Sequence, residues 1–161
     1  MITQYWNVLT EFKHYEQYYI RYQIKSQRGD AIISAACIAF SVLTAAGWLS
    51  SLLSPLLSAV IISLLQVISA IKPLFPFSKQ STALQYLIPE ISNLLLEVER
   101  TWNDIYSLSD EKISSFIHTY QSRYNEMDSR ITSGIYLPVS KRCEIYAENE
   151  CKKYFSHRYN V

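Results

Sequence analysis

Glycine is scarce in this sequence, and so are runs of like charge; each shortage excludes a class of structure or function. Only three of the 161 residues are glycine, which suits a nearly all-helical chain because glycine weakens helices. The net charge is only +1, and no stretch is dominated by one sign. A dedicated duplex nucleic-acid binder needs a basic face to displace counterions, so the sequence argues against that class of protein.

The longest stretch without Asp, Glu, Lys, Arg or His is residues 31–71. All 15 Lys and Arg, all 14 Asp and Glu and all three His lie outside that stretch. A soluble core normally spreads its apolar residues along every element rather than gathering them into one block. A membrane-spanning helix needs about 20 apolar residues to cross about 30 Å of hydrocarbon. We therefore predict two transmembrane helices, at 31–52 and 56–71, with a turn at Ser54 and Pro55.

The charges on either side of the uncharged stretch predict its orientation. Lys and Arg residues occur before it and after it, whereas the predicted turn has none. Positively charged flanks favour the cytoplasmic side of a membrane. We therefore expect a multi-pass protein of the inner (plasma) membrane with both termini in the cytoplasm. In that reducing compartment, Cys37, Cys143 and Cys151 are expected to be free thiols.

Outside the stretch, apolar and aromatic residues follow heptad spacing, which predicts amphipathic helices. The first stripe is rich in tyrosine and consists of Tyr5, Val8, Phe12, Tyr15, Tyr19 and Tyr22. The second consists of Leu84, Leu87, Ile91, Leu94, Val98, Ile105 and Leu108, and the third of Ile113, Ile117, Tyr120, Tyr124, Met127 and Ile131. A short last helix is expected at 140–157. These stripes must bury against one another or against neighbouring subunits.

The predicted fold is therefore all-α and has three parts. Residues 1–30 form an N-terminal cytoplasmic amphipathic helix, residues 31–72 a two-helix transmembrane hairpin, and residues 73–161 a C-terminal cytoplasmic helical region. We expect the cytoplasmic helices to pack into a bundle. Pro89 should either open a helix or kink it, and Ser109 should cap the start of the next helix.

Residues that could carry catalysis are not arranged for it. His14, His118 and His157 are far apart and match no metal-ligand spacing, and Cys143 and Cys151 lack the second pair of a zinc site. The sequence contains no Walker loop, no G-x-S-x-G motif and no glycine-rich phosphate cradle. We therefore expect neither an enzyme nor a bound metal or cofactor.

Polar side chains recur within the predicted hairpin, and two explanations compete for them. They either line a water-filled path, or they make hydrogen bonds between packed helices, which serine also makes to its own helix backbone. Gln66 is the strongest pore candidate, because its amide is costly in lipid unless it is paired. Two helices have no interior, so any pore requires a ring of subunits, for example a tetramer. The pore-lining candidates are Ser34, Ser41, Thr44, Ser63, Gln66 and Ser69.

The order of these parts resembles the SLATT family of bacterial two-transmembrane effectors. The resemblance rests on a tyrosine-rich helix that leads into a two-span hairpin, and on a tryptophan in the helix that follows, within the sequence LLLEVERTW (residues 94–102). It implies a pore-forming effector that depolarises the inner membrane in antiphage defence. It also implies control by a nucleotide-derived signal, such as an oligonucleotide or cyclic nucleotide, and a partner nucleotidyltransferase encoded nearby.

A nucleotide signal would need cations for its phosphates and aromatic faces for its bases. The candidates are Arg21, Tyr22, Lys25, Arg28, Arg123, Arg130, Lys141 and Arg142. The plainer explanations are membrane anchoring for the first four and a solvated helix surface for the last four.

Three functions from different classes therefore remain open. The leading hypothesis is an oligomeric membrane pore triggered from the cytoplasm. The second is a membrane-anchored helical interaction module without pore activity, in which the hairpin serves only as a tether. The third is a soluble helical protein in which residues 31–71 form a buried central hairpin.

Overall fold

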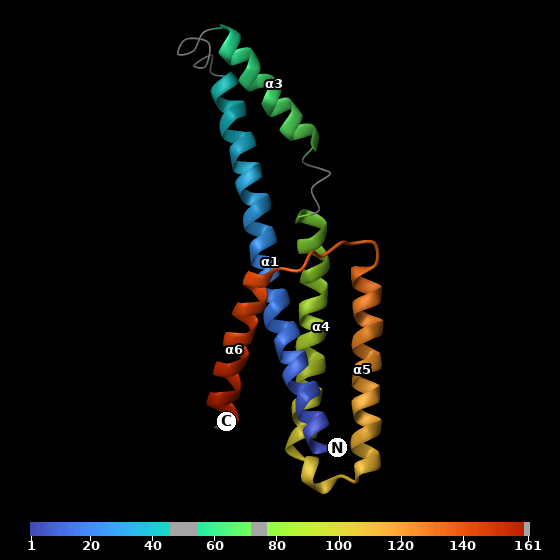
Figure 1. The fold of residues 1–161 in the computed structure, drawn as a ribbon. Helices are drawn as coiled ribbons and strands as arrows, with labels where there is room; N and C mark the ends of the chain where they lie inside the picture. The colour runs from blue at the N-terminus through green and yellow to red at the C-terminus, as the bar shows by residue number, and fades with distance from the viewer. Residues whose placement is uncertain (46–54, 72–76, 160–161) are drawn as a thin grey trace. The chain divides into compact units, whose positions relative to one another are not determined.

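The protein is helical in the part that a computed structural model describes, residues 1–45, 55–71 and 77–159 (Figure 1). No strand occurs within those ranges. The all-α prediction is therefore confirmed. In chain order the helices are α1 (Ile2–Ala45), α3 (Pro55–Ile71), α4 (Phe77–Asn103), the short 3-10 helix η2 (Ile105–Ser107), α5 (Asp110–Thr132) and α6 (Lys141–Tyr159).

The chain divides into two compact units, and the division falls inside α1. The first unit, called the bundle below, combines Met1–Ile24 with Lys79–Val161. The second unit is Lys25–Ser78. Since α1 is a single helix from Ile2 to Ala45, it belongs to both units without interruption.

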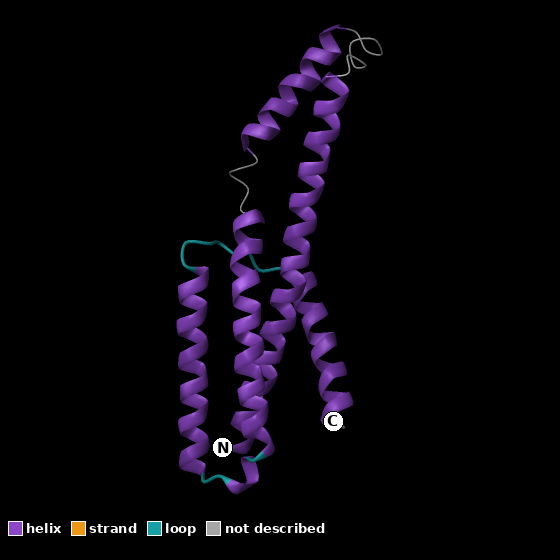
Figure 2. Cartoon of the chain, turned by 180° about the vertical axis from the view of Figure 1, so that it is seen from behind, coloured by secondary structure: helices purple, strands orange, loops and turns teal. Residues whose placement is uncertain are grey.

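The bundle consists of the first part of α1 together with α4, α5 and α6, which alternate in direction (Figures 1 and 2). The first part of α1 contacts each of the other three helices. The Tyr5 hydroxyl donates a hydrogen bond of 2.9 Å to the Val98 carbonyl of α4. The ring of Phe12 stacks on Tyr124 of α5 at 5.3 Å, and another α1 ring, that of Trp6, meets Phe155 of α6 at 5.1 Å. This part of α1 is therefore central to the bundle.

The predicted stripes form the bundle core. Buried members of these stripes are Tyr5, Val8, Phe12, Tyr22, Leu84, Leu87, Ile91, Leu94, Val98, Ile105, Ile113, Tyr120 and Met127. Tyr15, Tyr19 and Ile117 are half-buried and pack against them. Leu9 and Leu95 are buried although they lie beside the predicted stripes. A helix with neighbours on several sides buries more than one stripe, which explains both additions.

Three residues were expected to begin, end or bend helices, and they behave differently. Pro89 lies inside α4, so it does not open that helix. Ser109 occupies the cap position before α5 with an extended backbone, as predicted, but its side chain makes no capping hydrogen bond. The loop after α5 contains Gly134, whose φ of +76° lies in the left-handed region that favours glycine.

In the second unit, helix is confirmed up to Ala45 and from Pro55 to Ile71. The predicted turn residue Ser54 lies outside the described residues, and Pro55 begins α3. Within the described ranges, no helix has both the length and the apolar character of a membrane span. Several large apolar side chains of this unit are exposed, among them Ile32, Ile38, Val42, Leu64 and Val67.

Substitution of Leu87 tests the core. Leu87→Ala removes a side chain that is fully buried and should lower the free energy of unfolding by about 2–5 kcal/mol. Leu96→Ala, on the same helix but at a side chain that is 56% exposed, should change it by about 0.5 kcal/mol or less. Denaturant unfolding of the purified chain, followed by circular dichroism, measures both. Equal effects of the two variants would contradict the packing of α4.

Candidate functional site

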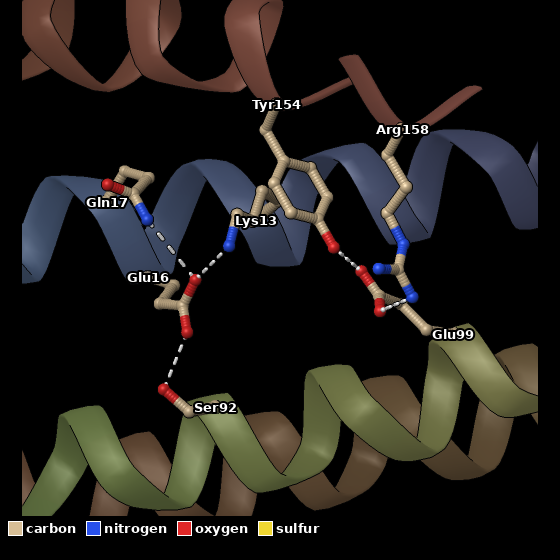
Figure 3. Close-up of polar contacts among 7 residues, drawn as sticks. All are labelled: Lys13, Glu16, Gln17, Ser92, Glu99, Tyr154 and Arg158. Atoms are coloured by element: carbon tan, nitrogen blue, oxygen red, sulfur yellow. Dashed lines mark hydrogen bonds and ion pairs between the residues drawn. The ribbon is translucent and has the colours of Figure 1, made fainter. Parts of the chain in front are cut away.

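A seam of polar side chains joins α6 to α1 and α4, although most of this interface is apolar (Figure 3). Its first carboxylate is Glu16 of α1, which is buried. Glu16 accepts hydrogen bonds from Lys13 at 2.6 Å, from Ser92 at 2.6 Å and from Gln17 at 3.3 Å. A buried carboxylate is stable only when such donors replace water, so Glu16 fixes α4 against α1 through Ser92.

The second carboxylate of the seam is Glu99 of α4, which is 5% exposed. It accepts a hydrogen bond from the Tyr154 hydroxyl and forms an ion pair of 3.1 Å with Arg158, both of α6. Burial and then the neighbouring Glu99 carboxylate raise the pKa of Tyr154 well above its usual range. The Lys13 ammonium lies 4.1 Å from the centre of the Tyr154 ring, so both carboxylates are linked through α6.

A cluster of tyrosines occupies the opposite interface, between α1 and α5. The Tyr15 ring stacks on Tyr124 at 4.9 Å, and the hydroxyls of Tyr19 and Tyr124 lie 3.5 Å apart. Nearby, the Oδ1 atom of Asp128 is buried without a hydrogen-bond partner. Burial raises the pKa of the Asp128 carboxyl, although the Tyr19 hydroxyl acts in the opposite direction. The surroundings of Asp128 therefore disfavour the charged form of its carboxyl group.

Two of the predicted ligand-binding arginines are engaged in ion pairs between α4 and α5. Arg123 binds both oxygens of Glu97, at 2.5 and 3.2 Å, and Arg130 binds both oxygens of Glu90, at 2.9 and 2.6 Å. The Arg123 guanidinium holds the pKa of the Glu97 carboxyl below its usual range. These pairs border a groove of about 400 Å³. Carboxylates already neutralise both arginines, which makes this groove a poor site for a phosphate.

Other predicted ligand-binding residues meet at the end of the bundle where α6 begins. The Arg21 guanidinium lies 4.7 Å from the centre of the Tyr146 ring, and Tyr22 is buried. Lys141 and Arg142 are exposed in the first turn of α6. The structure therefore brings Arg21 close to the start of α6, a proximity that the sequence did not reveal. The exposed Lys25 and Arg28 belong to the second unit.

The pore-lining candidates lie in the second unit. The Ser41 hydroxyl donates to the Cys37 carbonyl at 2.7 Å, and the Ser63 hydroxyl to the Ala59 carbonyl at 2.9 Å. Both serines therefore make the bond to their own helix that was one of the two explanations. The Gln66 side chain is exposed and Ser34 is half-buried. The side chains of Thr44 and Ser69 are outside the described part.

An apolar groove runs between α1 and α6 beside the polar seam. It has a volume of about 680 Å³, and its lining includes Trp6, Tyr15, Cys151 and Phe155. Burial raises the pKa of the Cys151 thiol to about 11, which makes this thiol unreactive at neutral pH. All three cysteines are free, as predicted. The described residues contain no group of three or more His, Cys, Asp or Glu side chains that could hold a metal ion.

Comparison of the chain with known protein families, with curated protein sequences and with solved structures gave no match. The resemblance to the SLATT family therefore stays a prediction. Function has to be argued from the helices, their charges and their exposed surfaces.

The polar seam should contribute more to stability than the exposed ion pairs do. Glu99→Ala leaves the partly buried Tyr154 hydroxyl and the Arg158 guanidinium without their acceptor, which should cost about 1–3 kcal/mol. Glu90→Ala removes the acceptor of an exposed pair and should cost about 1 kcal/mol or less. Thermal unfolding of both purified variants measures the difference, and a larger loss of stability for Glu90→Ala would refute the prediction.

Asp128 should make stability depend on pH. Its native pKa is raised, so the burial penalty acts above that pKa and disappears as the pH falls below the unfolded value of about 3.9. Asp128→Asn should therefore increase the free energy of unfolding at pH 7, and the increase should vanish towards pH 4. Denaturant titrations between these pH values measure it. The exposed Glu126→Gln on the same helix serves as the control, and an equal gain there would contradict the assignment.

Proposed function

We propose that the chain is an oligomeric membrane pore whose helical bundle controls a membrane hairpin formed by residues 31–72. The observation that carries this proposal is the continuity of α1. One helix begins in a bundle held by aromatic and charged side chains and runs on into residues 31–45, which contain no Asp, Glu, Lys, Arg or His. Because α1 is one continuous helix, no loop separates the bundle from the proposed hairpin.

The surface of the second unit supports a lipid environment. Large apolar side chains on both of its helices are exposed, including Ile32 at 69% and Leu64 at 57%. Water disfavours exposed apolar side chains of this size, whereas hydrocarbon accepts them. The same unit carries Gln66, whose exposed amide favours water or another subunit over lipid. Lipid on one side and a polar path on the other would suit both kinds of side chain.

A hairpin of two helices cannot enclose water, so the proposal requires several copies of the chain in a closed ring. Neighbouring hairpins would supply the remaining walls of the pore. The inner membrane and a homo-oligomer are the partners that this proposal needs.

The family resemblance supplies the trigger and the setting of the proposal. It implies a nucleotide-derived signal, a nearby nucleotidyltransferase and a role in bacterial antiphage defence. Of the predicted ligand-binding residues, Arg21, Lys141 and Arg142 are favoured over Arg123 and Arg130, because carboxylates already bind the latter two.

Ion flux through liposomes tests the pore. The purified full chain, reconstituted with an entrapped fluorescent reporter of potassium, should leak, at rest or after addition of an oligonucleotide or cyclic nucleotide. Gln66→Leu should reduce the flux because it removes the polar group proposed to face water, and Gln66→Asn should retain most of it. No flux from the wild type under any of these conditions would sink the proposal.

A membrane-anchored interaction module is the second candidate. The apolar groove between α1 and α6 favours it, because partly exposed aromatic surface such as that of Trp6 suits a protein partner. Replacement of residues 31–72 by an unrelated two-span anchor separates the two functions in cells. A tether would keep its biological activity after the exchange, whereas a pore would lose it.

A further inference from the structure

The loop between α5 and α6, residues 133–140, presents apolar side chains outward from a fixed backbone. Tyr136 is 78% exposed and Val139 is 82% exposed. Between them, Leu137 is half-buried against the core. Exposed apolar residues at the tip of a constrained loop are typical of a contact surface.

Hydrogen bonds from the bundle hold this loop in place. The amide of Gln80, a side chain only 2% exposed, donates to the Tyr136 carbonyl at 2.7 Å. The backbone N–H of Ser140 donates to the Tyr18 hydroxyl at 3.1 Å. This hydrogen bond from the buried Gln80 amide fixes the backbone at Tyr136, the residue whose side chain is exposed. The exposure of Tyr136 is therefore built into the fold.

The two residues that bind the loop, Tyr18 and Gln80, also show at which end of the bundle the loop lies. Tyr18 precedes Ile24, where α1 leaves the bundle, and Gln80 follows Lys79, where the chain returns to it. The loop is thus attached to the end of the bundle at which both connections to the uncharged residues are made. In Figure 2 the loop crosses the bundle beside the start of α4.

Charge distinguishes this end of the bundle from the other. Lys79, Lys141 and Arg142 are exposed here, and Glu144 is the acidic residue in the first turn of α6. At the far end, the exposed charged residues near the exposed Tyr106 of η2 in the sequence are Arg100, Asp104, Asp110, Glu111 and Lys112. Since α5 has 23 residues, the two ends are about 35 Å apart.

We infer that loop 133–140 is a lipid-contact loop, which places Tyr136 and Val139 in the interface of an anionic bilayer while Lys141 and Arg142 bind the headgroups. Tyrosine is enriched at membrane interfaces because its ring is apolar and its hydroxyl is polar. Apolar burial and attraction of Lys and Arg to anionic lipids act together at such sites. The inference rests on the membrane attachment in the proposed function and adds a second contact with the bilayer, made by the bundle.

Two matched tryptophan substitutions test the loop. The full chain with Tyr136→Trp, or with Tyr106→Trp as the control, is reconstituted in liposomes of phosphatidylcholine and anionic phosphatidylglycerol. Part of the lipid carries bromine on the acyl carbons next to the headgroup, which quenches nearby indoles. Subtraction of the wild-type signal isolates the added indole. We expect emission from position 136 to be blue-shifted and quenched, and emission from position 106 to be neither. Equal quenching at both positions would overturn the inference.

Charge reversal tests the headgroup contact. Lys141→Glu combined with Arg142→Glu should reduce the quenching at position 136 in anionic liposomes and leave it unchanged in pure phosphatidylcholine. The control pair, Lys152→Glu with Lys153→Glu further along α6, should have no such effect. Equal losses for both pairs would show general charge attraction and refute a specific lipid-contact loop.

Flotation of the wild type after an alkaline carbonate wash separates failure of this inference from failure of the proposed function. A chain that stays with the liposomes but shows no quenching at position 136 keeps its membrane hairpin and lacks the loop contact. A chain that the wash removes has no membrane hairpin, and the proposed function falls together with the inference.

Discussion

A single helix, α1, has one part in the bundle and one part in the second unit, where its residues are uncharged. The rest of the structure depends on this constraint. Up to Ile24, α1 lies among three helices and buries Tyr5, Leu9 and Phe12. Beyond Asp30 it contains no Asp, Glu, Lys, Arg or His. The aromatic packing of the first part therefore holds the helix from which the uncharged part continues without an intervening loop.

The bundle holds α1 by two kinds of contact that differ in how sharply they define position. Apolar packing between α1 and α4 is extensive, and it is not directional. The carboxylates of Glu16 and Glu99 define position more sharply. A shift of one helix along another would break their hydrogen bonds, because each carboxylate needs its donors at hydrogen-bond distance. Buried ion pairs are weak sources of stability and are better known for fixing one arrangement. That role fits the seam on α6.

The sequence was sufficient for the helices and for most of the core, because heptad spacing reports which face of a helix is buried. It was insufficient where the burial or the ion pairing of a residue depends on residues far away in the sequence. Leu9 and Leu95 are buried because α1 and α4 each have more than one neighbour, and Glu99 is buried because Tyr154 and Arg158 meet it 55 and 59 residues further along the chain. The same limit applied to Arg123, whose partner Glu97 lies 26 residues away. No local pattern distinguishes such an arginine from a free cation.

The helices of the bundle are attached by different kinds of contact. On α4, Leu84, Leu87 and Ile91 are fully buried, and Glu99 is buried beside them. On α6, Cys143, Ala147, Cys151 and Phe155 are buried, and the seam adds polar contacts between Glu99 and α6. Water can replace polar contacts at small cost, whereas exposed apolar surface is penalised in full. The first turn of α6 also carries Lys141 and Arg142, which supply the positive charge next to the lipid-contact loop. The same helix therefore contacts α1 and carries this charge. In the proposed pore, any trigger that displaced α6 would therefore alter both at once.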